Sequence, residues 1–117
     1  MARTPVTQSA VLAGLHDGLP ISVQATTSRT VVSNDAVRVV AFAMDAGQEL
    51  TDHSAPRPVV VQVLQGSLTF GLAGVAHQLV AGDVVYLAPS ERHSLLATSA
   101  CRFVLFMAMA PEHSDPS

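Results

Sequence analysis

The fold is decided by residues 47–66, which read GQELTDHSAPRPVVVQVLQG. The run Val59–Leu64 inside it is apolar at nearly every position, whereas a strand with one solvated face would alternate apolar and polar residues. Its β-branched residues favour a strand, and the nearby Pro56, Pro58 and Gly66 are typical of strand boundaries. This stretch therefore predicts a strand that is covered on both faces.

Similar short runs, rich in Val, Thr, Ile, Leu and Phe, occur on both sides of this stretch, and turn residues separate them. Many short strands at regular spacing predict an all-β sandwich or barrel. The ten predicted strands are Ile21–Thr27, Thr30–Ser33, Val37–Met44, Glu49–His53, Val59–Leu64, Leu68–Leu72, Ala76–Val80, Val84–Leu87, His93–Ala97 and Arg102–Met109.

One helix is predicted ahead of the strands. Apolar residues recur at helical spacing within the range Val11–Leu15, and Thr7 or Ser9 is available as the N-cap. The Gly-Leu-Pro sequence at residues 18–20 predicts the end of this helix.

The chain is short and poor in charge. Of its 117 residues, 49% are hydrophobic and only 13% charged, whereas a typical soluble domain is about 25% charged. That length fits one domain over residues 1–117, with a core at about residues 5–110 and a flexible tail at 111–117. The net charge of −3 and the six scattered Arg argue against a nucleic-acid partner. No apolar run reaches the roughly 18 residues of a membrane helix, so no membrane partner is expected.

The single cysteine, Cys101, cannot form an internal disulfide. It stands beside Arg102 in an apolar run, so a buried, reduced thiol is expected rather than a catalytic one. The N-terminal sequence Met-Ala-Arg-Thr-Pro has no apolar segment typical of a signal peptide. A cytoplasmic protein is therefore expected.

Two of the five histidines, His53 and His93, are the candidates for chemistry. Each follows a turn and lies at the edge of a predicted strand, where the mouth of a barrel would be. Taken alone, two histidines on separate strands are equally well explained by structural hydrogen bonds. His16, His77 and His113 are expected to be exposed to solvent.

These two histidines belong to segments that resemble the two motifs of the cupin superfamily. Residues 47–66 resemble the first motif, in which five residues separate Gly47 from His53, and Gly82–His93 resembles the second. The resemblance covers nearly the whole chain. It implies a small single-domain cupin, an all-β double-stranded β-helix or jelly-roll barrel with one short N-terminal helix.

Two metal-ligand positions of the cupin motif are apolar in this chain. The second His of the motif falls at Ala55 and its Glu at Val59, so only His53 and His93 match the family's ligands. A divalent ion such as Zn²⁺ generally takes three or four ligands. The resemblance therefore implies at most a weakly held divalent metal (Zn, Mn, Fe, Ni or Cu). The nearest spare donors are Glu49, Asp52, Ser54 and Gln62.

Because two metal ligands of the cupin motif are missing, the favoured function is binding of a small molecule in the barrel. An alternative is a metal-dependent cupin enzyme of the dioxygenase or isomerase type, using His53, His93 and an unidentified third ligand. A metal-free enzyme with a neutral His as general base is a variant of it, and a structural dimer without a ligand is a third candidate. The predicted ligand-binding residues are His53, His93, Val59, Val61, Tyr86 and Phe106, with Phe42, Met44, Phe70 and Met107 as further lining candidates.

A homodimer is expected as well. Val59–Leu64 and Phe103–Met107 are both apolar on their two faces. A small barrel cannot cover both faces of several strands by itself, whereas a partner subunit could.

Overall fold

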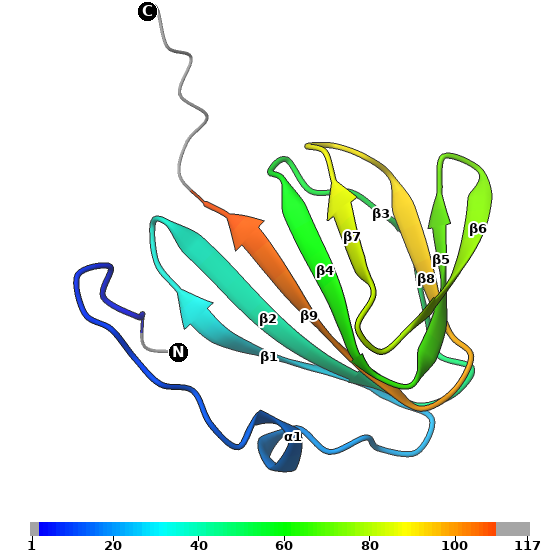
Figure 1. Ribbon diagram of the computed structural model, residues 1–117, viewed down its shortest axis with the longest axis horizontal. Helices are drawn as coiled ribbons and strands as arrows, with labels where there is room; N and C mark the ends of the chain where they lie inside the picture. The colour runs from blue at the N-terminus through cyan, green and yellow to red at the C-terminus, as the bar shows by residue number, and fades with distance from the viewer. Residues whose placement is uncertain (1–2, 110–117) are drawn as a thin grey trace, which may run out of the picture.

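The computed structural model describes residues 3–109, which form nine strands and one short helix (Figure 1). The helix is α1 (Leu15–Gly18), and the strands are β1 (Thr26–Ser33), β2 (Val37–Met44), β3 (Glu49–His53), β4 (Val59–Gln65), β5 (Ser67–Leu72), β6 (Val75–Val80), β7 (Val84–Leu87), β8 (His93–Ala97) and β9 (Cys101–Ala108). No helix among these residues is long and apolar enough to cross a membrane. The tail predicted at 111–117 lies outside the described residues.

The strands form two sheets that face each other (Figure 1). The larger sheet has the order β1-β2-β9-β4-β7, and the smaller one has the order β3-β8-β5-β6. All the paired strands are antiparallel, and several neighbours are distant in the chain, since β9 lies between β2 and β4. This arrangement is a double-stranded β-helix, which confirms the predicted fold class.

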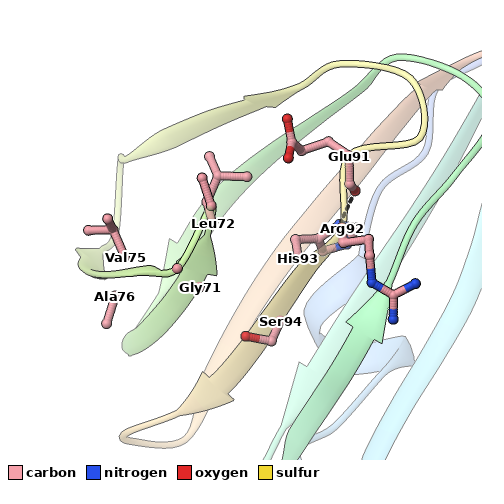
Figure 2. A pocket seen from close by; sticks show the side chains of 10 residues that line it. Gly71, Leu72, Val75, Ala76, Glu91, Arg92, His93 and Ser94 are labelled. Carbon is pink, nitrogen blue, oxygen red and sulfur yellow. Dashed lines mark hydrogen bonds between the residues drawn. The ribbon is translucent and has the colours of Figure 1, made fainter.

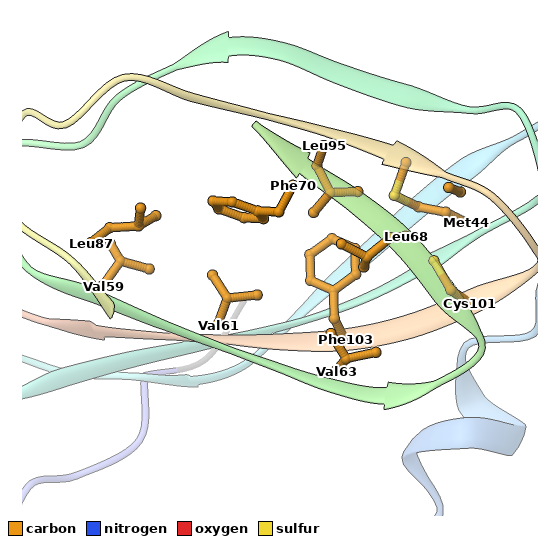
Figure 3. Packing of buried hydrophobic residues seen from close by; sticks show 11 residues of the cluster. Met44, Val59, Val61, Val63, Leu68, Phe70, Leu87, Leu95, Cys101 and Phe103 are labelled. Carbon is orange, nitrogen blue, oxygen red and sulfur yellow. The ribbon is translucent and has the colours of Figure 1, made fainter. Parts of the chain in front are cut away.

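The hydrophobic core lies between the two sheets (Figure 3). Alternate residues of β4 face inward because side chains of a strand alternate between its faces, and Val59, Val61 and Val63 are at most 2% exposed. They pack in one cluster with Phe70 of the smaller sheet and Phe103 of β9. Burying such a side chain stabilises the fold by roughly 1.5–3 kcal/mol.

Eight of the ten predicted strands, those that correspond to β2 through β9, agree with the structure to within one residue at each end. The predictions Ile21–Thr27 and Thr30–Ser33 are wrong as two separate strands, because a single strand, β1, begins at Thr26. The residues before it form a loop in which the backbone N–H of Gln24 donates to Asp45 Oδ2 at 2.8 Å. A side-chain acceptor of this kind competes with sheet pairing, so the loop is favoured there.

The predicted N-terminal helix is much shorter than its apolar spacing indicates. Only α1 is helical, and it follows Gly14, which has a left-handed φ of +70°. Val11 is 93% exposed and Leu12 is 41% exposed, so neither side chain is buried in the core. An isolated helix of about two or three turns is marginal in water, which explains why residues 11–14 are not helical.

The outer face of the larger sheet is covered over one half. There, Leu15 and Leu19 lie against Leu64 and Val104 around a hollow of about 50 Å³. The other half carries exposed apolar side chains, described below. The prediction that both faces of β4 and β9 are covered thus holds for one half of the sheet within the described chain.

Candidate functional site

His53 and His93 lie side by side at one edge of the smaller sheet. His53 is the last residue of β3 and His93 is the first of β8, and the two are direct partners in the antiparallel pair. Their ring centroids are 6.3 Å apart. The sheet register therefore brings together the two histidines that the sequence singled out.

His93 is held in one orientation by two contacts. Its ring stacks on Phe70, with centroids 5.6 Å apart and planes 4° from parallel. Its Nδ1 lies 3.2 Å from the backbone oxygen of Glu91. A carbonyl oxygen only accepts hydrogen bonds, so Nδ1 is the donor of this contact. In the tautomer that has its one proton on Nδ1, Nε2 is the acceptor.

A cavity of about 250 Å³ opens between the sheets beside the two histidines. Its polar side chains are His53, Ser54 and His93, which come from the β3 end and the β8 start. No Asp, Glu, Lys or Arg is among the described residues that line it. The remaining lining residues are apolar: Phe42, Leu50, Ala55, Val59, Val61, Phe70, Leu95, Phe103, Leu105 and Met107.

Four of the six predicted ligand-binding residues line this cavity: His53, His93, Val59 and Val61. Their role in binding stays a prediction. The further candidates Phe42, Phe70 and Met107 also line it, whereas Met44 is fully buried in the core.

Tyr86 and Phe106 do not line the cavity, and this corrects their predicted placement. Leu87 of β7 faces the core, so strand alternation turns its neighbour Tyr86 outward, where it is 62% exposed. On β9, Leu105 and Met107 face the cavity, so Phe106 between them faces out. Phe103 and Leu105 are the lining residues of β9 that sequence reasoning missed. Met107, which was a candidate, lies on the same face of the strand and gives the alternation that would have identified them.

The two positions where a metal-binding cupin has a second His and a Glu lie in the cavity wall, as Ala55 and Val59. Neither side chain can bind a metal. Gln62 lies on the opposite face of β4 from Val61, so it does not supply the missing donor. Among the described residues, no group of three or more His, Cys, Asp or Glu could hold a metal ion. The donor set therefore does not fit a full cupin metal centre.

A second, more open hollow of about 510 Å³ lies at the turn between β5 and β6 (Figure 2). Its walls are Glu91–Ser94 on one side and Gly71–Ala76 on the other. His93 contributes to this hollow as well as to the cavity. The smaller cavity is less open than this hollow, and it has apolar walls with a few polar groups at one end, the pattern typical of ligand sites.

Cys101 lies away from this site, fully buried in the core. Burial raises the pKa of its thiol from 9.0 to about 11. A thiol that is protonated at neutral pH is a poor nucleophile, which agrees with the structural role predicted for it.

The sequence matches the family model of the AraC-like ligand binding domain over residues 36–112. No curated protein matches the chain. Among solved structures, a conserved protein of unknown function from Streptococcus pyogenes is 24% identical with a TM-score of 0.79, over 96% of this chain and 97% of that one. A cupin superfamily protein from Desulfitobacterium hafniense is 15% identical with a TM-score of 0.79, over 92% and 99% of the two chains. An RmlC-like cupin from Desulfovibrio desulfuricans is 22% identical with a TM-score of 0.78, over 87% and 99%.

These matches define the class of protein. The chain is a small cupin, and it belongs to the family of AraC-like ligand binding domains. The three solved structures are less than 25% identical, so they bear on the fold alone.

Proposed function

We propose that this domain binds a small, largely apolar molecule in the cavity between its two sheets, oriented by His53 and His93. The observation that carries the proposal is the cavity of about 250 Å³, which is open on one side and has its polar groups gathered at one end. Ligand sites are typically concave and apolar with a few convergent polar groups, which is the pattern found here.

The wall of the cavity favours binding over metal chemistry. Ala55 and Val59 add apolar surface where a metal-binding cupin has ligands. Phe42, Leu105 and Met107 are only partly buried, so a ligand would remove more of their apolar surface from water.

A thermal-shift screen tests the proposal, using uncharged compounds of about 8–12 non-hydrogen atoms, the size range that the cavity volume suggests. A ligand at 100 times its Kd stabilises the folded state by about 2.7 kcal/mol, which would raise Tm by several degrees. In Ala55→Phe, the added ring fills the cavity, and the shifts should disappear.

The matched control is Ala36→Phe, because Ala36 is exposed in the turn between β1 and β2 and lies outside the cavity. This variant should keep the thermal shifts of the unaltered protein. Shifts that persist in Ala55→Phe would place the ligand elsewhere and contradict the proposal.

A second candidate function, supported by the proximity of the two histidines, is a metal-dependent enzyme with a weakly bound divalent ion. Untagged protein would be analysed for Zn, Mn, Fe, Ni and Cu after incubation with each ion, alongside the double variant His53→Ala, His93→Ala. One metal per chain that is lost in the double variant would support this candidate. No metal in either protein would exclude it.

We further propose that the chain is a homodimer of cytoplasmic location. The buried, unpaired thiol of Cys101 supports a reducing compartment. The exposed apolar side chains on the larger sheet support the dimer, whose test is given in the Discussion.

A further inference from the structure

The proposed cavity also restricts the chemistry of its ligand, and the inference drawn here rests on that proposed function. Aromatic side chains line both walls. Phe42 and Phe103 of the larger sheet are stacked with centroids 4.8 Å apart. Phe70 and His93 of the smaller sheet form the parallel pair described above. Phe70 and Phe103 are each 1% exposed, so the partly buried Phe42 and His93 offer the remaining ring surface, one on each wall. This ring surface favours a planar ring in the ligand, because stacked and edge-to-face ring contacts add to the area they bury.

The absence of charged side chains among the described lining residues disfavours charged and polyhydroxylated ligands. A carboxylate or a sugar would lose water from several polar atoms inside the cavity. The three polar side chains at one end could replace only part of that hydration. The ligand is therefore expected to have one polar end and an apolar remainder.

The polar end is expected to be a hydrogen-bond donor. In the tautomer of His93 whose Nδ1 donates to the Glu91 carbonyl, Nε2 is the ring nitrogen that accepts from a ligand. A hydroxyl satisfies this nitrogen, whereas an ether or a methyl group leaves it without a hydrogen-bond partner.

The cavity volume of about 250 Å³ limits the size of the ligand. An apolar cavity of about 150 Å³ holds benzene. The larger cavity here has room for one ring with a short substituent. We propose that the ligand is an uncharged monocyclic phenol, with its ring between the aromatic walls and its hydroxyl donating to His93 Nε2.

Isothermal titration with matched probes tests this proposal. 4-Ethylphenol, 4-ethyltoluene and 4-ethylanisole share the ethyl-substituted ring, but only the phenol donates a hydrogen bond. The phenol should bind about tenfold more tightly than the other two. In His93→Phe, which keeps a ring for stacking on Phe70, this preference should vanish.

The matched control is His77→Phe, because His77 is exposed on β6 and does not line the cavity. This variant should keep the tenfold preference. A preference that survives in His93→Phe would overturn the role of His93.

The other outcomes separate the ligand class from the proposed function. If the three ring probes bind equally, or if arabinose or benzoate binds in their place, the phenol proposal is overturned while the cavity remains a ligand site. Xenon NMR supplies a ligand-independent check, since xenon enters dry apolar cavities. If neither xenon nor any probe enters, both the phenol proposal and the proposed function fail.

Discussion

At the residue scale, the turn between β4 and β5 depends on Gly66. Its φ is +78°, and a Cβ added there would overlap the backbone oxygen of Ala100 and lie 2.9 Å from Cys101 Cα. A left-handed conformation costs an L-residue about 1–2 kcal/mol, and the overlap with backbone adds to that cost. Gly66→Ala should therefore lower the free energy of unfolding by about 3 kcal/mol or more in urea titrations.

Gly74 provides the control for this prediction. Its φ is +77°, nearly the same, but a Cβ added there would have no atom within 4 Å. Gly74→Ala should show only the conformational cost of about 1–2 kcal/mol. Equal losses in the two variants would contradict the role assigned to the contact between Gly66 and Ala100.

The buried thiol of Cys101 should make the folded protein less stable at alkaline pH. Burial raises the pKa of its thiol from 9.0 to about 11 in the folded state, so the unfolded chain ionises first as pH rises. The stabilising contribution is therefore fully present below about pH 9 and is lost between pH 9 and 11. The loss amounts to at most about 3 kcal/mol.

Urea unfolding between pH 8 and 10.5 measures this effect. Cys101→Val removes the thiol while keeping a small apolar side chain in the core, and it should show a shallower alkaline decline. An identical decline in both proteins would show that other groups cause it.

The residues that decide the site were predictable to different degrees. Motif spacing identified His53 and His93, and apolarity identified Val59 and Val61, all of which line the cavity. Tyr86 and Phe106 were misplaced because their strands are apolar at nearly every position. Alternation then gives no sign of which face points inward, and the register of the neighbouring strand decides it.

At the scale of single elements, α1 is held to the sheet by Arg102. Its Nη1 donates to Gln65 Oε1 at 2.6 Å, and its Nη2 donates to the backbone oxygens of His16 at 3.4 Å and Leu19 at 3.5 Å. Its Nε is buried without a hydrogen-bond partner in the described structure, and this desolvation offsets part of the gain.

Arg102→Met should therefore loosen α1 while changing global stability by only about 1 kcal/mol. In hydrogen exchange, amides of residues 14–19 should exchange at least tenfold faster, and those of β4 and β9 should not. Arg38→Met, on the same sheet but without a contact to α1, is the control. Unchanged exchange at residues 14–19 would contradict the anchoring role.

The elements themselves were predictable where tertiary structure agrees with local preference. Turn residues and β-branched runs located β2 through β9 to within one residue. The prediction of a longer N-terminal helix was wrong for a physical reason. Apolar residues at helical spacing stabilise a helix only when they have a surface to pack on. Val11 is 93% exposed and has no such surface within the described chain.

At the scale of the whole molecule, the low charge content of the chain is explained by apolar residues on both faces of the larger sheet, the inner one and the outer one. Across its outer face, Val39, Phe106, Val60 and Tyr86 follow one another on four adjacent strands. Val84 and Tyr86 are 57% and 62% exposed. This row contains no charged residue, so a second copy could pack on it about a two-fold axis without repulsion between like charges.

Light scattering should accordingly give twice the chain mass of 12.2 kDa at micromolar concentration. Tyr86→Glu places a charge in the row and should yield monomers. Val75→Glu, at an exposed position on the smaller sheet, should remain dimeric. A monomer for the unaltered chain would contradict the homodimer proposal.

The central claim, that a small molecule binds between the two sheets, is tested most directly by methyl NMR during titration with 4-ethylphenol. We predict that methyl signals of Val59, Val61 and Leu105 shift with saturation, because these residues line the cavity. Signals of Val75 and Val84, which lie outside it, should stay in place. Shifts confined to the outside residues would contradict the account. So would the absence of methyl shifts with 4-ethylphenol, the other ring probes, benzoate and arabinose alike, each at millimolar concentration.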